Sequence, residues 1–467
     1  MPSLSDKLKS LGIKVGAPDL LKAAPVHRYG IDSVVAGAYH STPAGETFVA
    51  EQTFDAEYRH GHAAIRPGVP FEALAAWSRE PRFRELPLEA YAFLDTETSG
   101  LAGGTGTYAF LVGVGRFMSP ESETDKRMET DSSTDFEADK RIGTDLVAYS
   151  VVESRTETDS STGFEADKQI ETDSSTDKRM VFRLQQFFMR DPAEEAALLE
   201  GLAEFLAPCQ ALVTFNGKGF DAPLLITRYS LHNIPCPFGD FAHLDLLPLA
   251  RRLWRDRLPS RALKYLEENV LSAPRTTEEV PGYEIPYLYF DYLRSGDARP
   301  LKGVFYHNAM DVVAMAALLS HVDAILDDPF SELVEHGLDV VALAKFFEDL
   351  GNWDIAARLF ERGLEMELPE ADFWLALERL SRLQKRRGDL ETAVRLWERA
   401  AAQGHIYAHV ELAKYHEHQL RDYPEALKWT HSAVELVGTL DIPRYVYNHW
   451  MEELEHRKKR LDGKLRK

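Results

Sequence analysis

Acidic side chains follow an apolar segment of the chain at a spacing that could bind a metal ion. Asp95 and Glu97 come directly after the apolar run 92–94, which predicts a buried strand. Residues two apart on a strand point to the same side, so the two carboxylates repel each other unless a cation lies between them. The ordinary alternative is a solvated strand end before a turn, and other parts of the chain must decide between the two.

Two later segments supply matching residues. The run 211–215 predicts a second buried strand, and the segment Asn-Gly-Lys-Gly-Phe-Asp at 216–221 leads from it into a helix, ending on Asp221. Further on, His307 and Asp311 are four residues apart where a predicted apolar helix opens, so they share one helix face. Three acid-bearing elements can converge on a divalent cation. Carboxylate oxygens suit Mg²⁺ or Mn²⁺ better than Zn²⁺.

The three segments together resemble the exonuclease motifs of the DEDD superfamily, which has the ribonuclease H-like 3′–5′ exonuclease fold. The motifs are Asp-x-Glu after a strand, Phe-Asn-Gly-x-x-Phe-Asp, and His-Asn-x-x-Asp. The stretches Leu-Lys-Tyr-Leu at 263–266 and Val-Pro-Gly-Tyr-Glu-Ile-Pro at 280–286 are most similar to the YprB-type ribonuclease H-like domain. The resemblance covers about residues 87 to 325, apart from an insert.

The resemblance implies hydrolysis of a phosphodiester bond at a single-stranded 3′ end, with two Mg²⁺ or Mn²⁺ ions about 3.5 to 4 Å apart. Asp95 would bridge the two ions. Glu97 and Asp311 would complete the shell of one ion, and Asp221 would hold the other. His307 would take a proton from the attacking water, since its reference pKa suits a base at neutral pH.

The identity of the base stays open. One branch of the superfamily has a histidine five residues before the last aspartate, and the other has a tyrosine four residues before it. Here Tyr306 is five residues before Asp311 and His307 is four residues before it. The two residue types are therefore exchanged between the two spacings. Thr96 and Asn308 are expected to contact the substrate. Asn216 and Phe220 are expected to touch the terminal nucleotide or brace the site.

The most basic stretch is 250–264, with five arginines and one lysine against one aspartate. Its candidates for phosphate contacts are Arg251, Arg252, Arg255 and Lys264. Trp254 offers a stacking surface for a single strand. The alternative is a helix face whose arginines pair with acidic neighbours.

Three further patterns are weaker. His60 and His62 have a spacing that could ligate a metal, but no cysteine or acid cluster stands near them, so a surface turn is favoured. His243 and Asp245 could mimic a pair of site residues but are expected to be structural or peripheral. The run Gly-Gly-Thr-Gly at 103–106 lacks the lysine of a P-loop and does not open a helix.

Composition limits the remaining classes. A length of 467 residues allows about three domains, and a hydrophobic content of 44% supports packed cores. Two cysteines argue against a disulfide framework and favour a cytoplasmic setting. No apolar run approaches the roughly 18 residues of a membrane span, so no membrane partner is expected. A formal charge of -21 is unfavourable for binding nucleic acid, but the local distribution of charge matters more.

The N-terminal part divides into an accessory region and a predicted nuclease domain. Residues 1–86 predict an accessory layer with one or two strands. Residues 87–325 predict an α/β ribonuclease H-like domain, with a mixed five-stranded sheet flanked by helices. Within it, residues 119–180 repeat Glu-Thr-Asp-Ser-Ser-Thr and hold few apolar residues, which predicts a disordered acidic insert.

From about residue 338 the pattern is helical. Ala356, Ala393 and Ala426 belong to three similar turn-plus-helix segments. The spacing between these alanines is close to the 34-residue period of tetratricopeptide repeats. Residues 335–440 therefore predict an all-α tetratricopeptide-like repeat domain whose groove binds a protein partner, and residues 441–467 a frayed basic tail. The rival hypothesis is a non-catalytic scaffold for nucleic acid or protein, with the repeats as its main functional part.

Overall fold

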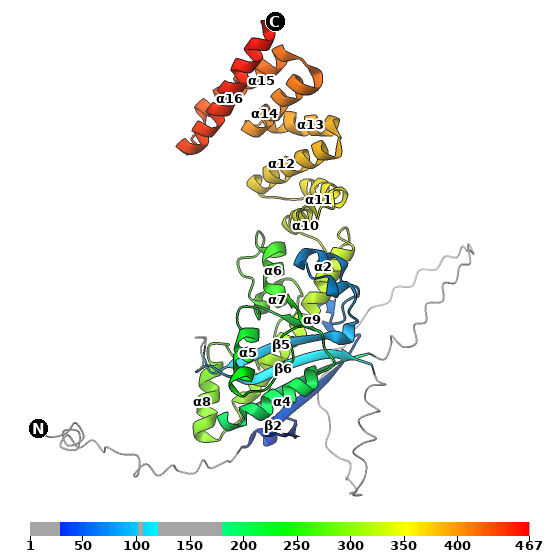
Figure 1. Ribbon diagram of the computed structural model, residues 1–467, viewed down its shortest axis with the longest axis vertical. Coiled ribbons are helices and arrows are strands. Elements are labelled where there is room, and N and C mark those ends of the chain that lie inside the picture. Colours follow the sequence, from blue (N-terminus) through cyan, green and yellow to red (C-terminus); the bar gives the residue numbers. More distant parts are fainter. Residues whose placement is uncertain (1–28, 101–105, 120–179, 467) are drawn as a thin grey trace, which may run out of the picture.

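The computed structural model describes residues 29–100, 106–119 and 180–466 (Figure 1). A seven-stranded sheet forms its centre, in the order β1-β2-β7-β6-β5-β8-β9. The strands are β1 (Ala38–Thr42), β2 (Gly45–Asp55), β5 (Tyr91–Thr98), β6 (Ala109–Met118), β7 (Val181–Phe188), β8 (Ala211–Thr214) and β9 (Ala242–Asp245). A separate ribbon pairs β3 (Arg59–His60) with β4 (Ala63–Ala64).

The mixed sheet has the predicted α/β class but two strands more than the five expected. Strands β1, β2, β7, β6 and β5 pair antiparallel, and β8 and β9 extend the sheet in parallel beyond β5. β1 and β2 come from residues 1–86, which the sequence predicts as an accessory layer. β2 instead pairs along β7 and buries Phe48 and Ala50, because an uncovered β7 edge would leave backbone groups without partners.

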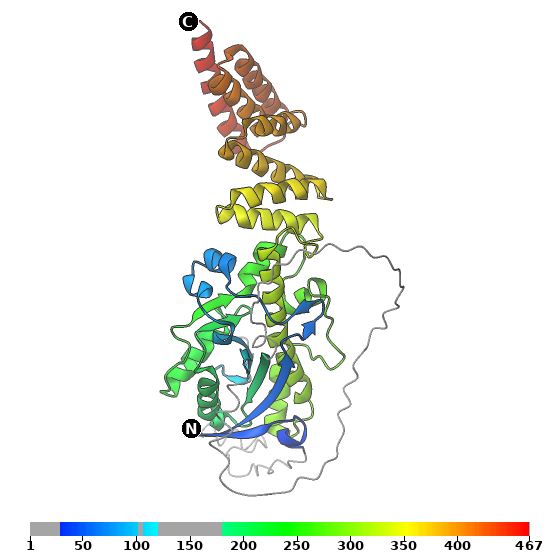
Figure 2. The ribbon, with the colours of Figure 1, turned by 90° about the vertical axis from the view of Figure 1, so that its right-hand side faces the viewer.

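Helices cover both faces of the sheet (Figure 2). One apolar cluster packs α9 against the face that carries Phe93 and Phe117. The other packs α4 and α5 against the face that carries Leu94 and Val114. The α-helices of this part are α2 (Glu72–Ser78), α4 (Glu195–Leu206), α5 (Asp221–Leu231), α6 (Leu246–Trp254), α7 (Leu263–Asn269), α8 (Ile285–Ser295) and α9 (Leu301–Asp327). Short 3₁₀ segments are η2 (Ile31–Ser33), η3 (Pro81–Arg84), η4 (Leu88–Ala90) and η6 (Pro192–Glu194).

The longest helix, α9, lies in the core. Contrary to the expectation from the sequence, it is long and apolar enough to cross a membrane by length and composition, alone among the helices of the described residues. However, 72% of that apolar window is buried inside the protein. Its apolar surface is therefore covered by the sheet and the neighbouring helices, as in the core helix of a globular domain.

The acidic insert connects two neighbouring strands. Met118, at the end of β6, is the register partner of Val181, at the start of β7. Nearly all of the segment between them, and with it the predicted disorder, lies outside the described residues.

Beyond α9 the chain forms helices that rise from one end of the sheet domain (Figure 1). They are α10 (Gly337–Asp349), α11 (Trp353–Glu365), α12 (Glu370–Arg387), α13 (Leu390–Ala401), α14 (Ile406–Tyr415), the π-helix η7 (His416–Leu420), α15 (Tyr423–Thr439) and α16 (Arg444–Leu465). Successive helices pack on one another, which fits the predicted repeat pattern.

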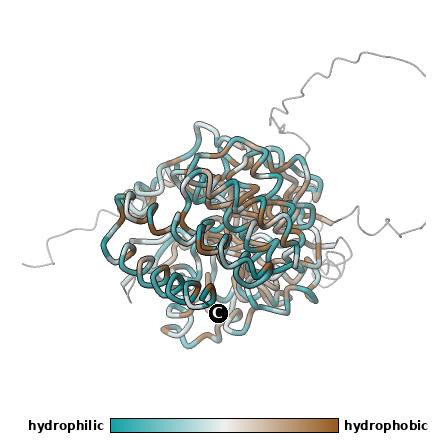
Figure 3. The backbone as a smooth tube through the Cα atoms, turned by 90° about the horizontal axis from the view of Figure 1, so that it is seen from above, coloured by the Kyte–Doolittle hydropathy of each residue, from teal (hydrophilic) through white to brown (hydrophobic). Residues whose placement is uncertain are grey.

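The prediction of a frayed basic tail is wrong. Residues 444–465 form α16, whose hydrophilic residues are visible beside the C-terminus in Figure 3. Three of its basic side chains pair with the buried carboxylate of Glu417, at 3.0 Å for Arg457, 2.6 Å for Arg460 and 3.0 Å for Lys464. Burial alone would raise the pKa of Glu417, but its contacts with Arg460 and Lys464 lower it to about 2. Ion pairs with Glu417 therefore hold the C-terminal helix α16 in place.

Candidate active site

The first two acids lie at the C-terminal end of β5, on the face that packs against α9. Asp95 is opposite Gly113 of β6, and both Asp95 and Glu97 are half-buried. Burial raises the pKa of the Asp95 carboxyl well above its usual range, and repulsion from Asp311, Glu97 and Asp221 raises it further. The pKa of Glu97 is raised well above its usual range by burial and then by Asp311 and Asp221. The four predicted carboxylates thus lie within electrostatic range of one another.

Asp221 is the first residue of α5 and follows a tight turn. Asn216 in that turn has a left-handed backbone with φ of 67°. Asp245, at the end of the next parallel strand, holds the turn by accepting backbone N–H bonds from Asn216 at 2.8 Å and Lys218 at 3.1 Å. Burial raises the pKa of Asp221 to about 6, and the Thr96 hydroxyl donates a hydrogen bond to its Oδ1. Asp245 therefore has the structural role that the sequence predicts.

The third segment lies within α9 rather than at its start. The helix begins at Leu301, so His307 and Asp311 stand in its second and third turns. Asn308, on the same segment, is fully buried, and its Nδ2 donates to Asp95 Oδ2 at 2.9 Å. Gln186 of β7 fixes the amide by donating to Asn308 Oδ1 at 2.9 Å.

Thr96 and Asn308 have a different role from the predicted substrate contact. Both side chains are buried, and each donates to one of the acids, Thr96 to Asp221 and Asn308 to Asp95. They orient carboxylates instead of facing a substrate. Phe220 is half-buried and directly precedes Asp221 at the start of α5.

An arginine that the sequence analysis missed binds the fourth acid. Arg275, with a side chain only 2% exposed, donates from its terminal nitrogens to Asp311 Oδ1 and to Glu279 at 3.0 Å. Its Nε donates to the fully buried Glu267 at 2.6 Å. These carboxylates come from separate elements, so no sequence spacing reveals the cluster. The Arg-x-x-x-Glu pair at 275 and 279 is the one local signal.

The histidine of the third segment faces the acids, and the tyrosine does not. His307 Nδ1 lies 2.9 Å from Glu279 Oε1, and its Nε2 lies 3.6 Å from Asp311 Oδ2. The Tyr306 hydroxyl instead accepts the backbone N–H of Thr276 at 3.1 Å. Of the two candidates for the base, His307 is the one whose ring lies next to a carboxylate of the site.

Two comparisons with known proteins identify the family. Residues 163–323 match the RNase H superfamily. The chain is also 30% identical over 392 residues to a protein of Bacillus subtilis (strain 168) named "Uncharacterized protein YprB", covering 81% of this chain and 78% of that protein. The chain belongs to the YprB family, with an RNase H-like fold. The resemblance inferred from the motifs is therefore confirmed.

The donor set of this RNase H-like site fits hard divalent cations, because it consists of carboxylate oxygens that repel one another. The described residues contain no group of three or more His, Cys, Asp or Glu side chains already arranged to hold a metal ion. Protein partners account for this: Asn308 holds Asp95, Thr96 holds Asp221 and Arg275 holds Asp311. A shared ion would have to bind the carboxylate oxygens that these partners do not contact.

Two arginines of the basic stretch at 250–264 bind the first helix of the repeats. Arg252 pairs with Asp349 of α10 at 2.5 Å, and Arg257 pairs with Asp339 of α10 at 2.8 Å. Trp254 is only 2% exposed and stacks on the His321 ring in the core, so the predicted stacking surface is wrong. The other apolar side chains of α6 are buried together with this tryptophan.

Three of the predicted phosphate-binding residues stay accessible to solvent. Arg251 is exposed, and the Arg255 side chain is 74% exposed. Lys264 is half-exposed and lies 3.7 Å from Glu279, which links it to the site.

The histidines near Gly61 are not on a simple surface turn. His60 is buried and lies 2.6 Å from Glu267, the same carboxylate that binds Arg275. His62 lies 3.3 Å from His321. His60 thus extends the charge network of the site into the β3–β4 ribbon.

Proposed function

We propose that the protein is a metal-dependent nuclease that removes nucleotides from the 3′ end of a single strand. The observation that carries this proposal is the meeting of carboxylates from β5, α5 and α9, where Thr96 of β5 binds Asp221 and Asn308 of α9 binds Asp95. Burial and like-charge neighbours raise the pKa of Asp95, Glu97 and Asp221 together. Perturbed carboxyl groups of this kind are concentrated at functional sites, and a divalent cation would relieve their repulsion.

Asp95, Glu97, Asp221 and Asp311 would hold the Mg²⁺ or Mn²⁺ ions. Bound ions of this type neutralise charge on the phosphodiester and lower the pKa of a bound water. The chain's own residues fix the acids before binding. Asn308 leaves one oxygen of Asp95 unoccupied by its amide, and Arg275 contacts only one oxygen of Asp311.

His307 is proposed as the base that accepts a proton from the attacking water. Glu279, at 2.9 Å, fixes the ring through Nδ1. With the proton on Nδ1, Nε2 presents its lone pair on the side of Asp311. A carboxylate behind the ring also stabilises the imidazolium that forms when Nε2 takes the proton.

The nucleic-acid strand is proposed to approach past Lys264, with Asn216 and Phe220 at its terminal nucleotide. Arg251 and Arg255 remain available for more distant phosphates. The helical repeats are proposed to bind a protein partner, and the protein to act in the cytoplasm.

The test compares wild type with Asp95→Asn and Asp311→Asn on single-stranded DNA and RNA labelled at the 5′ end. With Mg²⁺ or Mn²⁺, wild type should shorten the strands stepwise, and a blocked 3′ terminus should stop it. Each variant should lose at least about a thousandfold in rate, since one ligand of the ions is removed. Asp291→Asn, at an exposed position of α8, is the matched control. Equal rates for all four proteins would exclude this site as the source of hydrolysis.

A non-catalytic scaffold is the second candidate, favoured by one contact. Arg275 already supplies a cation to Asp311, so the site is partly neutralised without a metal. On this hypothesis single strands bind to wild type and to Asp95→Asn with equal affinity, and no product forms with either metal. Product that depends on Asp95 would contradict it.

A further inference from the structure

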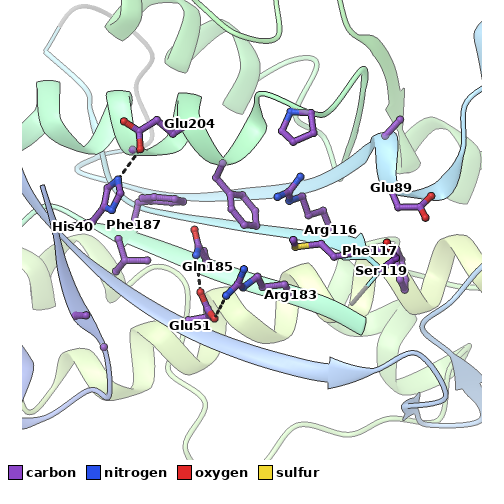
Figure 4. Close-up of a pocket in the computed structure, with 18 of the residues that line it drawn as sticks. His40, Glu51, Glu89, Arg116, Phe117, Ser119, Arg183, Gln185, Phe187 and Glu204 are labelled. Carbon is purple, nitrogen blue, oxygen red and sulfur yellow. Dashed lines mark hydrogen bonds and ion pairs between the residues drawn. The ribbon is translucent and has the colours of Figure 1, made fainter. Parts of the chain in front are cut away.

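A large pocket lies on the sheet face opposite the acids. It has a volume of about 1010 Å³ and is lined by residues of β1, β2, β6, β7 and α4 (Figure 4). Glu89 and Ala90, which precede β5, also line it, whereas the acids stand at the other end of β5. The short helix α4 covers only part of this face of the sheet, and the pocket occupies part of the area that it leaves uncovered.

Arg116 belongs to the face that the pocket occupies. Side chains on β6 alternate, and Gly113 and Gly115 approach Asn308 and Val312 of α9. Arg116 therefore points away from α9 and toward α4. Its guanidinium lies over the Phe205 ring of α4, 4.7 Å from the ring centre.

Two arginines meet across the floor of the pocket. Arg116 is the register partner of Arg183 on β7, an arrangement that is destabilising for like charges. Arg183 is neutralised by Glu51, whose Oε1 lies 2.8 Å away, and Glu51 also accepts from Gln185 at 2.6 Å. Figure 4 shows these two contacts as dashed lines and none at Arg116.

Arg116 has no carboxylate partner among the described residues, although its side chain is only 9% exposed overall. Its buried Nε makes no hydrogen bond in the described part of the chain. Its polar side-chain neighbour is the Cys209 thiol, whose pKa is raised by burial, so it stays neutral and cannot balance the charge. A buried cation without a counter-ion is strongly unfavourable, because burial removes the water that solvates the charge.

The acids around the pocket are mostly engaged elsewhere. Glu51 binds Arg183, and Glu204 binds His40 at 2.8 Å. Glu89 is half-buried at the rim and forms no ion pair with Arg116. Glu89 is the internal alternative to an external anion, and the experiment has to separate the two.

We propose that this pocket binds a small organic anion whose phosphate or carboxylate pairs with Arg116. The planar guanidinium can donate two parallel hydrogen bonds to either group. A volume of about 1010 Å³ is far larger than a single oxyanion needs and reaches the upper end of small-molecule sites. Val49, Phe187, Phe205 and Pro208 supply apolar wall for the body of the ligand.

The binding test uses calorimetry on the full chain with three probes: phenyl phosphate, phenylacetate and inorganic phosphate. At least one aromatic probe should bind, and inorganic phosphate should bind at least about tenfold more weakly because it fills little of the pocket. The two aromatic probes separate a phosphate ester from a carboxylate. Arg116→Met should weaken the better probe by about tenfold to a hundredfold. Arg294→Met, at an exposed position of α8, should leave it unchanged.

Absence of binding by both aromatic probes would overturn the proposal, as would an affinity that Arg116→Met leaves unchanged. A second measurement separates a loss of ligand binding from a loss of folding stability. Without any ligand, Arg116→Met should keep or raise the Tm, because an unbalanced charge is removed. A fall of more than about 5 °C in both Arg116→Met and Glu89→Gln would show an internal ion pair and also overturn it. Loss of nuclease activity in Asp95→Asn would not affect either result.

Discussion

At the scale of single residues, the candidate site combines carboxylates with dedicated protein partners. Asp95 binds a buried amide, Asp221 binds a buried hydroxyl and Asp311 binds a buried guanidinium. Each partner orients its acid, and only the guanidinium of Arg275 carries a charge. Arg275 is therefore the residue whose removal changes the electrostatics of the site most.

Arg275→Met should lower the free energy of unfolding by about 3 to 5 kcal/mol. The change leaves Glu267 and Glu279 in the interior without their cation, since both contact Arg275 directly. Urea unfolding followed by circular dichroism measures the loss. Arg275→Lys should fall between the two proteins, because one ammonium cannot reach all three carboxylates in a fixed geometry. Arg299→Met, at an exposed ion pair, is the control and should leave stability nearly unchanged.

In the absence of metal, the stability of the protein should fall as pH rises from 5 to 7. The pKa of Asp221 is about 6 in the folded protein against 3.8 as reference, so the folded state holds this proton more tightly. The resulting stabilisation is complete below pH 3.8 and is lost as pH rises through about 6, and it amounts to about 3 kcal/mol. Asp95 and Glu97 shift in the same direction.

Calorimetric scans in a chelator at pH 5, 6 and 7 test this dependence on Asp221. Asp221→Asn cannot take up the proton, so its Tm should vary less over the interval than that of wild type. Added Mg²⁺ should stabilise wild type more at pH 7 than at pH 5, because the ion competes with protons for the same oxygens. Parallel pH profiles for the two proteins would refute the assignment.

The sequence predicts the acids of this site and names Thr96 and Asn308 as substrate contacts, but it misses Arg275. Asp95, Glu97, Asp221 and Asp311 stand in short motifs at the borders of apolar runs, so local patterns suffice. Arg275 contacts carboxylates that come from distant segments, and its role exists only in the folded chain. For the same reason the pairing of Arg252 with Asp349 replaces a predicted phosphate contact.

At the scale of elements, the contact between β6 and α9 sets the position of Asp95. β6 approaches α9 closely at Gly113, where a Cβ atom would lie 2.2 Å from Asn308 Oδ1. The amide of Asn308 then spans from Gln186 on β7 to Asp95 on β5. The sequence predicts these strands and this helix, whereas their close approach depends on a glycine that has no motif around it.

Gly113→Ala should lower stability by about 1 to 3 kcal/mol, because the added methyl group has to displace a fully buried side chain. If the proposed nuclease function holds, its rate should fall at least about tenfold as Asn308 releases Asp95. Thermal unfolding and the 3′-end assay measure the two effects. Gly239→Ala is the matched control, since nothing lies within 4 Å of the position of its Cβ. A variant that matches wild type in both measurements would show that α9 can move away without consequence.

At the scale of the whole molecule, the sheet domain and the first repeat helices share one hydrophobic core. The cluster that contains Phe93 and α9 continues without a break to Phe346 of α10, Phe360 of α11 and Leu383 of α12. Trp77 of α2 stacks on Phe346 with ring centres 6.3 Å apart. The helices α13 to α16 instead contribute to two smaller clusters, one of which also includes Leu377 of α12. The change of sequence pattern near residue 338 marks a change of architecture but not the end of the core.

Truncation should therefore have opposite outcomes at two positions. A chain ending at residue 336 loses α10 to α12, exposes the apolar faces of α2 and α6, and breaks the ion pair between Arg257 and Asp339. Each large side chain that loses its cover costs about 1.5 to 3 kcal/mol, so this chain should be largely unfolded or aggregated. A chain ending at residue 404 keeps every member of the shared core.

Thermal unfolding followed by near-ultraviolet circular dichroism compares the two chains with the full protein. The chain that ends at residue 404 should unfold within about 5 °C of the full protein. The cluster around Val437, which it loses, lies outside the shared core, and the cluster around Trp397 loses only Ala408 and Leu412 of its buried members. Trypsin resistance of the sheet domain should follow the same order. If the chain ending at residue 336 were as stable as the full protein, the contacts of α10 would be peripheral, and the repeats could move independently of the active site. If the chain ending at residue 404 also unfolded, the stability of the sheet domain would depend on the whole stack of helices. The helix α16, held by ion pairs with Glu417, would then be an essential cap of the repeats.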